Sequence, residues 1–319
     1  MKKRVYLILF IFLSGGLLLV ARLYNLHMEE GPARSIQATM QYGKGRSFDG
    51  KRGILYDRHG RELALNFRGK RVYPRGQLAS HVLGFVGKDN QGLEGIEYLY
   101  DTLLRGKRSQ VAAIQDGRGN WIYPLPAAEG KQELNGKDLT LTLDEFVQHT
   151  AEEELAAQVT RLRAKGGIVL VIDPFSGGIL ALAIHPSFDP NTFYKVSPRT
   201  WRNRAVTDSL EPGSTFKVVS MAAALEDGLA SLNDQVNGER GVLALSRSIT
   251  LRDTHPYGQL SLEEAIAQSS NIGMIKISRR LGRERLYYYT RLFGFGSRTG
   301  IKLPGEATGL VHPPKKWSR

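Results

Sequence analysis

Apolar residues follow one another almost without interruption near the start of the chain. After residues 1–4, with their three basic side chains, residues 5–21 read VYLILFIFLSGGLLLVA and are followed by Arg22. A helix needs about this length to cross ~30 Å of hydrocarbon. Because basic residues stay on the cytoplasmic side, we predict a cytoplasmic tail, a membrane anchor over residues 5–21 and an extracytoplasmic body. A cleaved signal peptide is the alternative, but ARLYNLHMEE offers no convincing small-x-small cleavage site.

The next part of the chain is rich in glycine and charge, and its apolar runs are short. Three of these runs predict strands joined by turns: Gly53 to Tyr56, His81 to Val86 and Leu139 to Leu143. The turn-rich stretch LPAAEGKQELNGKD precedes the last of them. We therefore expect an elongated β-rich unit over residues 22–136 and a second unit over 137–319.

The second unit begins with helical periodicity in DEFVQHTAEEELAAQVTRLRAK. The apolar positions at helical spacing are Phe146, Val147, Leu155, Val159 and Leu162. GGIVLVIDPFSGGILALAIH follows as two apolar runs joined by Asp-Pro-Phe-Ser-Gly-Gly, a pattern typical of a hairpin. Because both runs are almost continuously apolar, we expect a sheet that is buried on both faces.

Helical patterns then alternate with breaks. One helix is predicted after Pro212-Gly213, another at the capping box Ser261-Leu-Glu-Glu264, and the pattern resumes from Asn271 to Leu281. A hairpin followed by helices indicates the α+β class.

Composition and charge narrow the chemistry. The chain has 319 residues, 41% of them hydrophobic, and no cysteine, which excludes a disordered chain, a disulfide framework and thiolate catalysis. The formal net charge of +13 favours an anionic partner, such as phospholipid headgroups, a wall polymer or nucleic acid. No basic run interleaved with aromatic residues is present, so we expect no nucleic-acid partner. His149, His185 and His255 lack metal-ligand spacing, and we expect neither a metal nor a cofactor.

The stretch EPGSTFKVVS contains a serine and a lysine three places apart. Since Pro212-Gly213 cannot continue a helix, Ser214 should lie at a helix N-terminus with Lys217 one turn away on the same face. Ser214 could be a nucleophile beside an oxyanion site, with Lys217 as a base if burial lowers its pKa. A capping serine and a solvated lysine are the alternative.

A second polar element interrupts the apolar helical pattern in AIAQSSNIGMIKIS. Ser269 and Asn271 could project into a cleft from a short break between two helices, Ser269 passing protons and Asn271 holding a substrate amide. A helix-to-helix turn with Asn271 as its cap is the alternative.

These two elements, in this order, resemble the signature of the penicillin-binding proteins and serine β-lactamases. KRGILYDRHGRELALN, GLEGIE, VIDPFSGGILALA, RNRAVTDSLEPGSTFK and FGFGSRTGIKLPGEATG also resemble segments of that family, in the same order. Together these segments make the chain similar to the class B penicillin-binding proteins of the division type, the FtsI-like peptidoglycan D,D-transpeptidases. Glu211-Pro212-Gly213 and Ser-Ser-Asn favour the division-type branch.

The resemblance implies a function. Ser214 would attack the penultimate D-Ala of a stem peptide ending in D-Ala-D-Ala, Lys217 and Ser269 would move protons, and Asn271 would bind substrate. The acyl-enzyme would then give a septal cross-link, and β-lactams would acylate the same serine. A single-pass protein of the bacterial inner membrane is implied, with its body in the periplasm or extracytoplasmic space and with a membrane glycosyltransferase and divisome proteins as partners.

The sequence departs from this family in two places. The segment between Asn66 and Tyr73 is shorter than in most relatives, which bears on partner binding. No Lys-Thr-Gly or Lys-Ser-Gly occurs in the chain, although the family uses that third motif to bind the substrate carboxylate. We therefore expect an incomplete transpeptidase that lacks its C-terminal part, with a doubtful activity and with an unpaired edge and an exposed face on the hairpin over 168–184. A non-catalytic divisome scaffold and a serine β-lactamase or β-lactam sensor are the alternatives.

Overall fold

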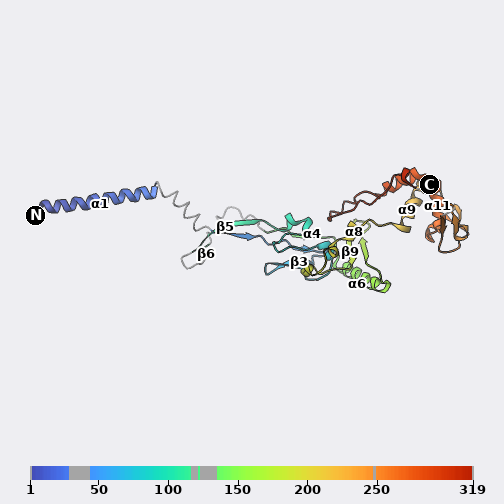
Figure 1. Cartoon of the computed structure of the whole chain (residues 1–319), viewed down its shortest axis with the longest axis horizontal. Coiled ribbons are helices and arrows are strands. Elements are labelled where there is room, and N and C mark those ends of the chain that lie inside the picture. The colour runs from blue at the N-terminus through green and yellow to red at the C-terminus, as the bar shows by residue number, and fades with distance from the viewer. Residues whose placement is uncertain (1, 29–43, 116–120, 123–134, 247–248, 318–319) are drawn as a thin grey trace. The chain divides into compact units, whose positions relative to one another are not determined.

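The computed structural model describes residues 2–28, 44–115, 121–122, 135–246 and 249–317 (Figure 1). The chain divides into two compact units that interleave in sequence. The first unit comprises Met1–Pro74, Lys88–Gln91 and Tyr100–Leu141. The second comprises Arg75–Gly87, Gly92–Leu99 and Thr142–Arg319. No sequence pattern indicated that two short segments before Tyr100 belong to the second unit.

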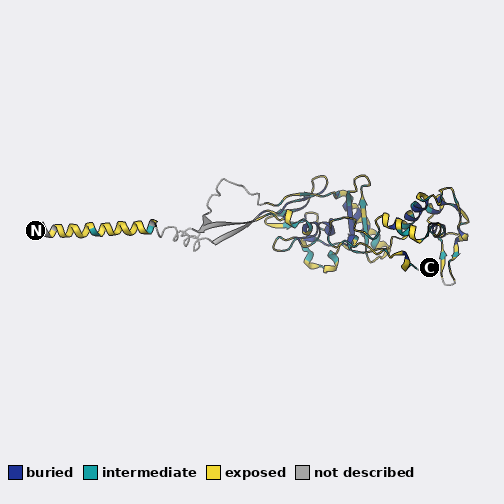
Figure 2. Cartoon of the chain, turned by 90° about the horizontal axis from the view of Figure 1, so that it is seen from above, coloured by how far each residue is buried: buried dark blue, intermediate teal, exposed yellow. Residues whose placement is uncertain are grey.

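The first helix, α1 (Lys2–Met28), carries the apolar run. Its stretch Tyr6–Leu26 is long and apolar enough to cross a membrane. The side chains described in this helix are exposed almost throughout, as the yellow helix in Figure 2 shows. An exposed apolar helix of this length is typical of a membrane span.

The rest of the first unit is built mainly of short strands. An antiparallel sheet has the order β1 (Lys44–Asp49), β5 (Arg108–Gln115) and β6 (Trp121–Ile122). A second sheet has the order β4 (Lys70–Val72), β3 (Glu62–Phe67), β2 (Leu55–Tyr56) and β7 (Leu139–Thr140). The pair β2 and β7 is parallel and joins distant parts of the chain. A short helix, α5 (Asp101–Leu104), ends in the fully buried Leu104.

Gly53 explains how the two ends of this unit meet. A Cβ atom on Gly53 would lie 1.9 Å from the carbonyl oxygen of Lys137, a separation that no side chain allows. The close approach brings β2 beside β7 and is consistent with hydrogen bonds such as that from the amide of Leu139 to the Ile54 carbonyl (2.9 Å). Only glycine, which has no Cβ atom, leaves room for the Lys137 carbonyl at this position.

The strand predicted from His81 to Val86 is wrong. Residues Ser80–Leu83 form the helix α3, and Gly84 follows with a φ of +73°. Phe85 is buried and stacks on Phe193 with ring centroids 4.0 Å apart. Packing in this aromatic cluster of the second unit outweighs the β propensity of the apolar run. The neighbouring helix α4 spans Gly95–Leu99.

The helix predicted at the start of the second unit is confirmed as α6 (Glu145–Leu162), and Asp144 caps its first amides. The hairpin is also confirmed, as β8 (Gly167–Ile172) and β9 (Ile179–His185). Ala151 and Leu155 of α6 pack on Ala181 and Ala183 of the hairpin.

The hairpin has one closed edge and one open edge. On β9, Leu182 exchanges two hydrogen bonds with the Gln148 side chain, of 2.7 and 3.0 Å, which satisfy the outward-facing amide and carbonyl of that residue. On β8 no further strand pairs within the described ranges, and Leu170 and Ile172 remain 49% and 48% exposed. The expected burial on both faces is therefore wrong for β8, whereas the expected open edge and exposed face are confirmed.

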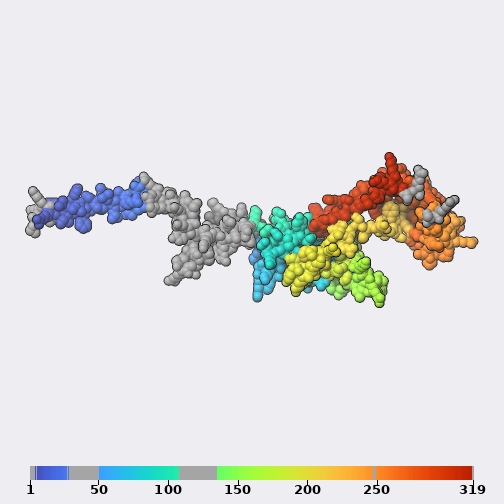
Figure 3. Space-filling model, viewed as in Figure 1, coloured from blue at the N-terminus to red at the C-terminus, as the bar shows by residue number. Residues whose placement is uncertain are grey.

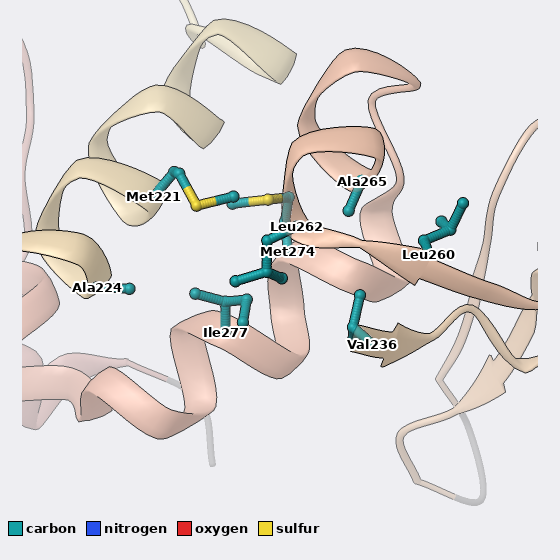
Figure 4. Close-up of a cluster of buried hydrophobic side chains, with 8 residues drawn as sticks. All are labelled: Met221, Ala224, Val236, Leu260, Leu262, Ala265, Met274 and Ile277. Carbon is teal, nitrogen blue, oxygen red and sulfur yellow. The ribbon is translucent and has the colours of Figure 1, made fainter. Parts of the chain in front are cut away.

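The later helices share a core that Figure 4 shows. The helices are α9 (Lys217–Glu226), α10 (Leu262–Ala267) and α11 (Asn271–Leu292). Met221, Leu262, Met274 and Ile277 are buried together among them. Because this cluster joins α9 to the link between α10 and α11, it positions the residues of the candidate site. The capping box at Ser261 and Glu264 is confirmed.

Short elements connect these helices. The strands pair antiparallel as β10 (Gln235–Asn237) with β13 (Gln259–Ser261) and β11 (Val242–Ala244) with β12 (Thr250–Arg252). The remaining short helices are η1 (Pro190–Lys195), α7 (Pro198–Trp201), α8 (Arg204–Thr207), η2 (Gly213–Phe216), η3 (Glu239–Gly241) and η4 (Pro314–Lys316). In Figure 3 the red segment that follows α11 lies against the yellow segment around α8, where the amide of Ala307 donates to the Val206 carbonyl (2.8 Å). The α+β class predicted from sequence is confirmed.

Candidate active site

Ser214 lies in the short 3₁₀ turn η2, immediately before α9. Gly213 precedes it with a φ of +59°, a left-handed conformation that glycine adopts without strain. Side chains three residues apart eclipse each other in a 3₁₀ turn, so Ser214 and Lys217 emerge from the same face. Ser214 is exposed, and within the described part of the chain its hydroxyl has no hydrogen-bond partner. A hydroxyl in this position is accessible to an incoming carbonyl group.

Lys217 is the first residue of α9, and the residue as a whole is half-buried. The Nζ atom donates to the carbonyl oxygen of Ser269 (2.5 Å) and to the Oγ atom of Ser269 (2.9 Å). Burial lowers the pKa of Lys217 from its ordinary value, and the nearby carboxylate of Asp253 opposes this by favouring the charged form. A lowered pKa leaves a larger fraction of the amine neutral at a given pH, and only the neutral amine can act as a base.

Ser269 occupies the break between α10 and α11 that the sequence predicted. It has a φ of +55°, in the left-handed region, and its amide donates to the Ile266 carbonyl (3.1 Å). This conformation turns both the carbonyl and the hydroxyl of Ser269 toward Lys217, 52 residues earlier in the chain. Two of the predicted residues are therefore in direct contact.

Asp253, which the sequence analysis did not single out, holds this break in place. Its Oδ1 atom accepts from the amides of Asn271 (2.5 Å) and Ile272 (3.2 Å), and its Oδ2 atom accepts from the Ser270 hydroxyl (2.6 Å). A carboxylate at the first amides of α11 also interacts favourably with the helix dipole. No spacing rule connects an aspartate after one short strand with a helix that begins 18 residues later.

Asn271 is the first residue of α11, and the preceding residue, Ser270, caps the helix. The alternative interpretation of the sequence placed the cap at Asn271. The Oγ atom of Ser270 accepts from the Gly273 amide (2.9 Å), and Ser270 is fully buried. The Asn271 side chain donates to the Arg252 carbonyl (3.0 Å), which fixes the orientation of its amide group. That cap assignment to Asn271 is therefore wrong, because the preceding residue performs it.

The three histidines named above do not gather. His149 pairs with Glu153 on α6, and His255 contacts the ring of Tyr257. Among the described residues, no group of three or more histidine or acidic side chains is placed to hold a metal ion.

Comparison with known proteins identifies the family. The sequence profile of the penicillin binding protein transpeptidase domain matches residues 167–319, and that of the penicillin-binding protein dimerisation domain matches residues 67–141. PenA of Neisseria meningitidis, a probable peptidoglycan D,D-transpeptidase, is 39% identical over 248 residues, which are 78% of this chain and 42% of PenA. FtsI of Escherichia coli, a peptidoglycan D,D-transpeptidase, is 30% identical over 256 residues, covering 80% of this chain and 42% of FtsI. This chain belongs to the class B penicillin-binding proteins.

A solved penicillin-binding protein has the same fold. Penicillin binding protein 3 of Mycobacterium tuberculosis superposes with a TM-score of 0.70 at 31% identity, over 86% of this chain and 58% of the other. The chain spans about two fifths of the length of PenA and of FtsI. Its 319 residues contain the Ser-x-x-Lys and Ser-Ser-Asn elements and no Lys-Thr-Gly.

Proposed function

We propose that this chain provides the acylation machinery of a peptidoglycan D,D-transpeptidase, with Ser214 as the nucleophile. The observation that carries the proposal is the contact of the Lys217 amine with both the carbonyl and the hydroxyl of Ser269, one turn from Ser214. A serine with an adjacent base, itself oriented by a third group, is the arrangement that nucleophilic catalysis requires.

The first step is the attack of the Ser214 hydroxyl on the penultimate D-Ala carbonyl of a stem peptide. A neutral lysine amine has two N–H groups and one lone pair. Ser269 accepts both N–H groups, so the lone pair of Lys217 is available for the Ser214 proton. The first amides of a helix have no intrahelical partners and favour the negative charge that develops on the substrate oxygen.

The second step is cleavage of the bond between the penultimate D-Ala carbonyl and the nitrogen of the terminal D-Ala. The Ser269 hydroxyl accepts from Lys217 and can donate its own proton to the leaving amine, which departs as D-Ala. An amine of a second stem peptide then attacks the ester carbonyl, its proton passes back along the same relay and Ser214 is released. Asn271, held by the Arg252 carbonyl, contributes an amide oxygen for the acyl chain.

The cellular setting forms part of the same proposal. The apolar helix α1 anchors the chain as a single span in the bacterial inner membrane, with the body in the periplasm or extracytoplasmic space. Septal cross-linking, a membrane glycosyltransferase and divisome proteins are the proposed context and partners. Ampicillin is bound by the Mycobacterium tuberculosis relative, which supports β-lactams as substrate analogues that acylate Ser214.

The test is labelling of the full chain in detergent by a fluorescent penicillin. The proposal predicts a labelled band that Ser214→Ala abolishes. Ser209→Ala is the matched control, because Ser209 is also exposed, lies five residues earlier and has no hydrogen-bond partner within the described residues. Equal labelling of the two variants would refute Ser214 as the nucleophile.

Two other functions predict different results. A serine β-lactamase would turn over a chromogenic cephalosporin rapidly, whereas a transpeptidase retains a long-lived adduct on Ser214. A scaffold would show no label on the folded wild-type chain and would bind its partners equally well as Ser214→Ala.

A further inference from the structure

A polar pocket of about 740 Å³ lies in the first unit, far in sequence from Ser214. Three segments form it: residues 50–52, the turn between β3 and β4, and residues 88–90, with Arg105 completing the wall. All the described lining residues are glycine, asparagine or charged residues. A pocket without aliphatic or aromatic lining is unsuited to an apolar ligand and suited to a small, highly charged one.

The lining charges are strongly unbalanced. Four exposed cations line the pocket, namely Lys51, Arg68, Lys88 and Arg105. A fifth cation, Arg52, is buried, and Asp89 is the only carboxylate among the described lining residues. Within the part of the chain that the structure describes, none of the four exposed cations forms an ion pair with a carboxylate. Cations that converge in excess of nearby carboxylates raise the local concentration of anions.

Buried and bridging guanidinium groups fix the shape of this pocket. Arg52, whose side chain is fully buried, donates to Asp101 (2.6 Å) and to the Asn90 carbonyl (3.0 Å). Arg105 donates to the Asp89 carbonyl (2.9 Å), so two guanidinium groups hold the loop over 88–91. Asn66 ties the other side by donating to the Arg52 carbonyl (2.9 Å). The cations therefore project from a structured wall and not from independent surface loops.

We propose that this pocket binds a ligand with two neighbouring phosphate groups. Two linked phosphates carry at least two negative charges a few ångströms apart, which four converging cations neutralise better than the single charge of a carboxylate. Arginine forks match phosphate oxygens in pairs, and lysine contributes a point charge. The site is separate from the acyl-transfer chemistry, because all its residues belong to the first unit and Ser214 belongs to the second.

Two sources share this chemistry. One is a pair of adjacent phosphate headgroups on the membrane that carries α1, and the other is a soluble or wall-borne diphosphate. The formal net charge of +13 is compatible with both. The experiment therefore needs one arm for the phosphate and another for the lipid.

The phosphate arm is calorimetric titration of sodium pyrophosphate into the full chain, held in phosphatidylcholine nanodiscs at constant ionic strength. The test variant combines Lys51→Gln, Arg68→Gln and Lys88→Gln, which removes charge and leaves Arg105 in place. The matched control combines Arg58→Gln and Lys137→Gln, two exposed cations of the same unit that do not line the pocket. We expect saturable binding that weakens about tenfold or more in the triple variant and is unchanged in the control.

The lipid arm repeats the titration in nanodiscs that contain phosphatidylglycerol. If headgroups occupy the pocket, the apparent affinity of the wild type for pyrophosphate falls in these discs and that of the triple variant does not. If the ligand is soluble, the wild type binds equally in both discs. Absence of saturable binding in phosphatidylcholine discs, or equal binding by the triple variant and the control, would overturn the proposal. Labelling of Ser214 by penicillin is measured separately and does not depend on either result.

Discussion

Asp253 provides the most demanding test of the candidate site, because its carboxylate performs two separable tasks. It accepts three hydrogen bonds, from the Ser270 hydroxyl and from the amides of Asn271 and Ile272. It also lies close enough to Lys217 to favour the charged form of the amine. Asp253→Ala removes both contributions, whereas Asp253→Asn retains a side chain of the same shape and removes the charge.

The stability effect follows from the hydrogen bonds. A net contribution of about 1 kcal/mol for each of the three bonds gives about 3 kcal/mol for Asp253→Ala, since water can reach the half-buried carboxylate and replace part of each bond. For a unit of this size that loss lowers the unfolding midpoint by about 6 to 12 °C. In Asp253→Asn the amide oxygen can still accept from the two backbone amides, so the expected loss is about 1 kcal/mol.

The effect on chemistry has a definite sign. Burial lowers the pKa of Lys217 and Asp253 opposes that shift. Removing the charge of Asp253 therefore lowers the pKa of Lys217 further, and the neutral amine persists to lower pH. The acid limb of the acylation rate should move to lower pH in Asp253→Asn.

The assay is time-resolved labelling by a fluorescent penicillin across pH, combined with thermal unfolding. Asp234→Asn is the control, because Asp234 is a partly exposed acid of the same unit that pairs with Arg280 at 3.6 Å. An acid limb that stays in place or moves to higher pH in Asp253→Asn would refute the electrostatic link to Lys217. A midpoint for Asp253→Ala equal to that of Asp234→Asn would refute the structural role.

Three further predictions concern single side chains. Lys217→Arg retains a donor but cannot act as a neutral base, so labelling of Ser214 should slow about 100-fold or more, and an unchanged rate would exclude Lys217 as the base. Burial raises the pKa of Glu152, so its ionisation costs stability as pH rises through the folded-state pKa. The unfolding midpoint of Glu152→Gln should therefore gain on that of the wild type as pH rises above the ordinary glutamate pKa of about 4. A difference between the two midpoints that stays constant with pH would contradict this. Gly84→Ala should destabilise the second unit by at least about 2 kcal/mol, because the new Cβ atom would lie 1.8 Å from the Glu94 carbonyl oxygen. Gly177→Ala is the control, because Gly177 also has a positive φ but a Cβ atom there would have no heavy atom within 4 Å. An equal loss of stability in the two variants would show that the close contact at Gly84 is unimportant.

Local patterns in the sequence predict many of the helices and strands of the fold. The helix α6, the hairpin and the capping box at Ser261 depend on residues close together in the chain, and all three are present. Periodicity was less informative about which side chains are inside. On α6, Phe146 and Leu162 were expected on the apolar face, yet they are 71% and 69% exposed.

The reason lies in how α6 meets the hairpin. Gln148 faces the sheet because its amide satisfies the outer edge of β9, a hydrogen-bonding demand that a hydrophobic pattern does not register. A polar residue therefore occupies the buried face. The run from His81 was misread for a related reason, since its place in an aromatic cluster depends on partners more than 100 residues away.

The candidate site shows the same division. The residue types at 214, 217, 269 and 271 could be named from sequence because each lies in a short motif. That Ser269 contacts Lys217, and that Asp253 holds the helix start at Asn271, depends on chain segments that meet only in the folded unit. The spacing of these residues along the sequence does not predict the distances between them in the folded unit.

Acylation of Ser214 is the central claim, and mass spectrometry of the intact protein and of its peptides tests it most directly. The full chain in detergent is incubated with benzylpenicillin and then digested to locate the adduct. The account predicts one penicilloyl group on the peptide that contains Ser214, persisting after excess antibiotic is removed and absent in Ser214→Ala. An adduct that survives Ser214→Ala, or a folded wild-type chain that forms none, would contradict it.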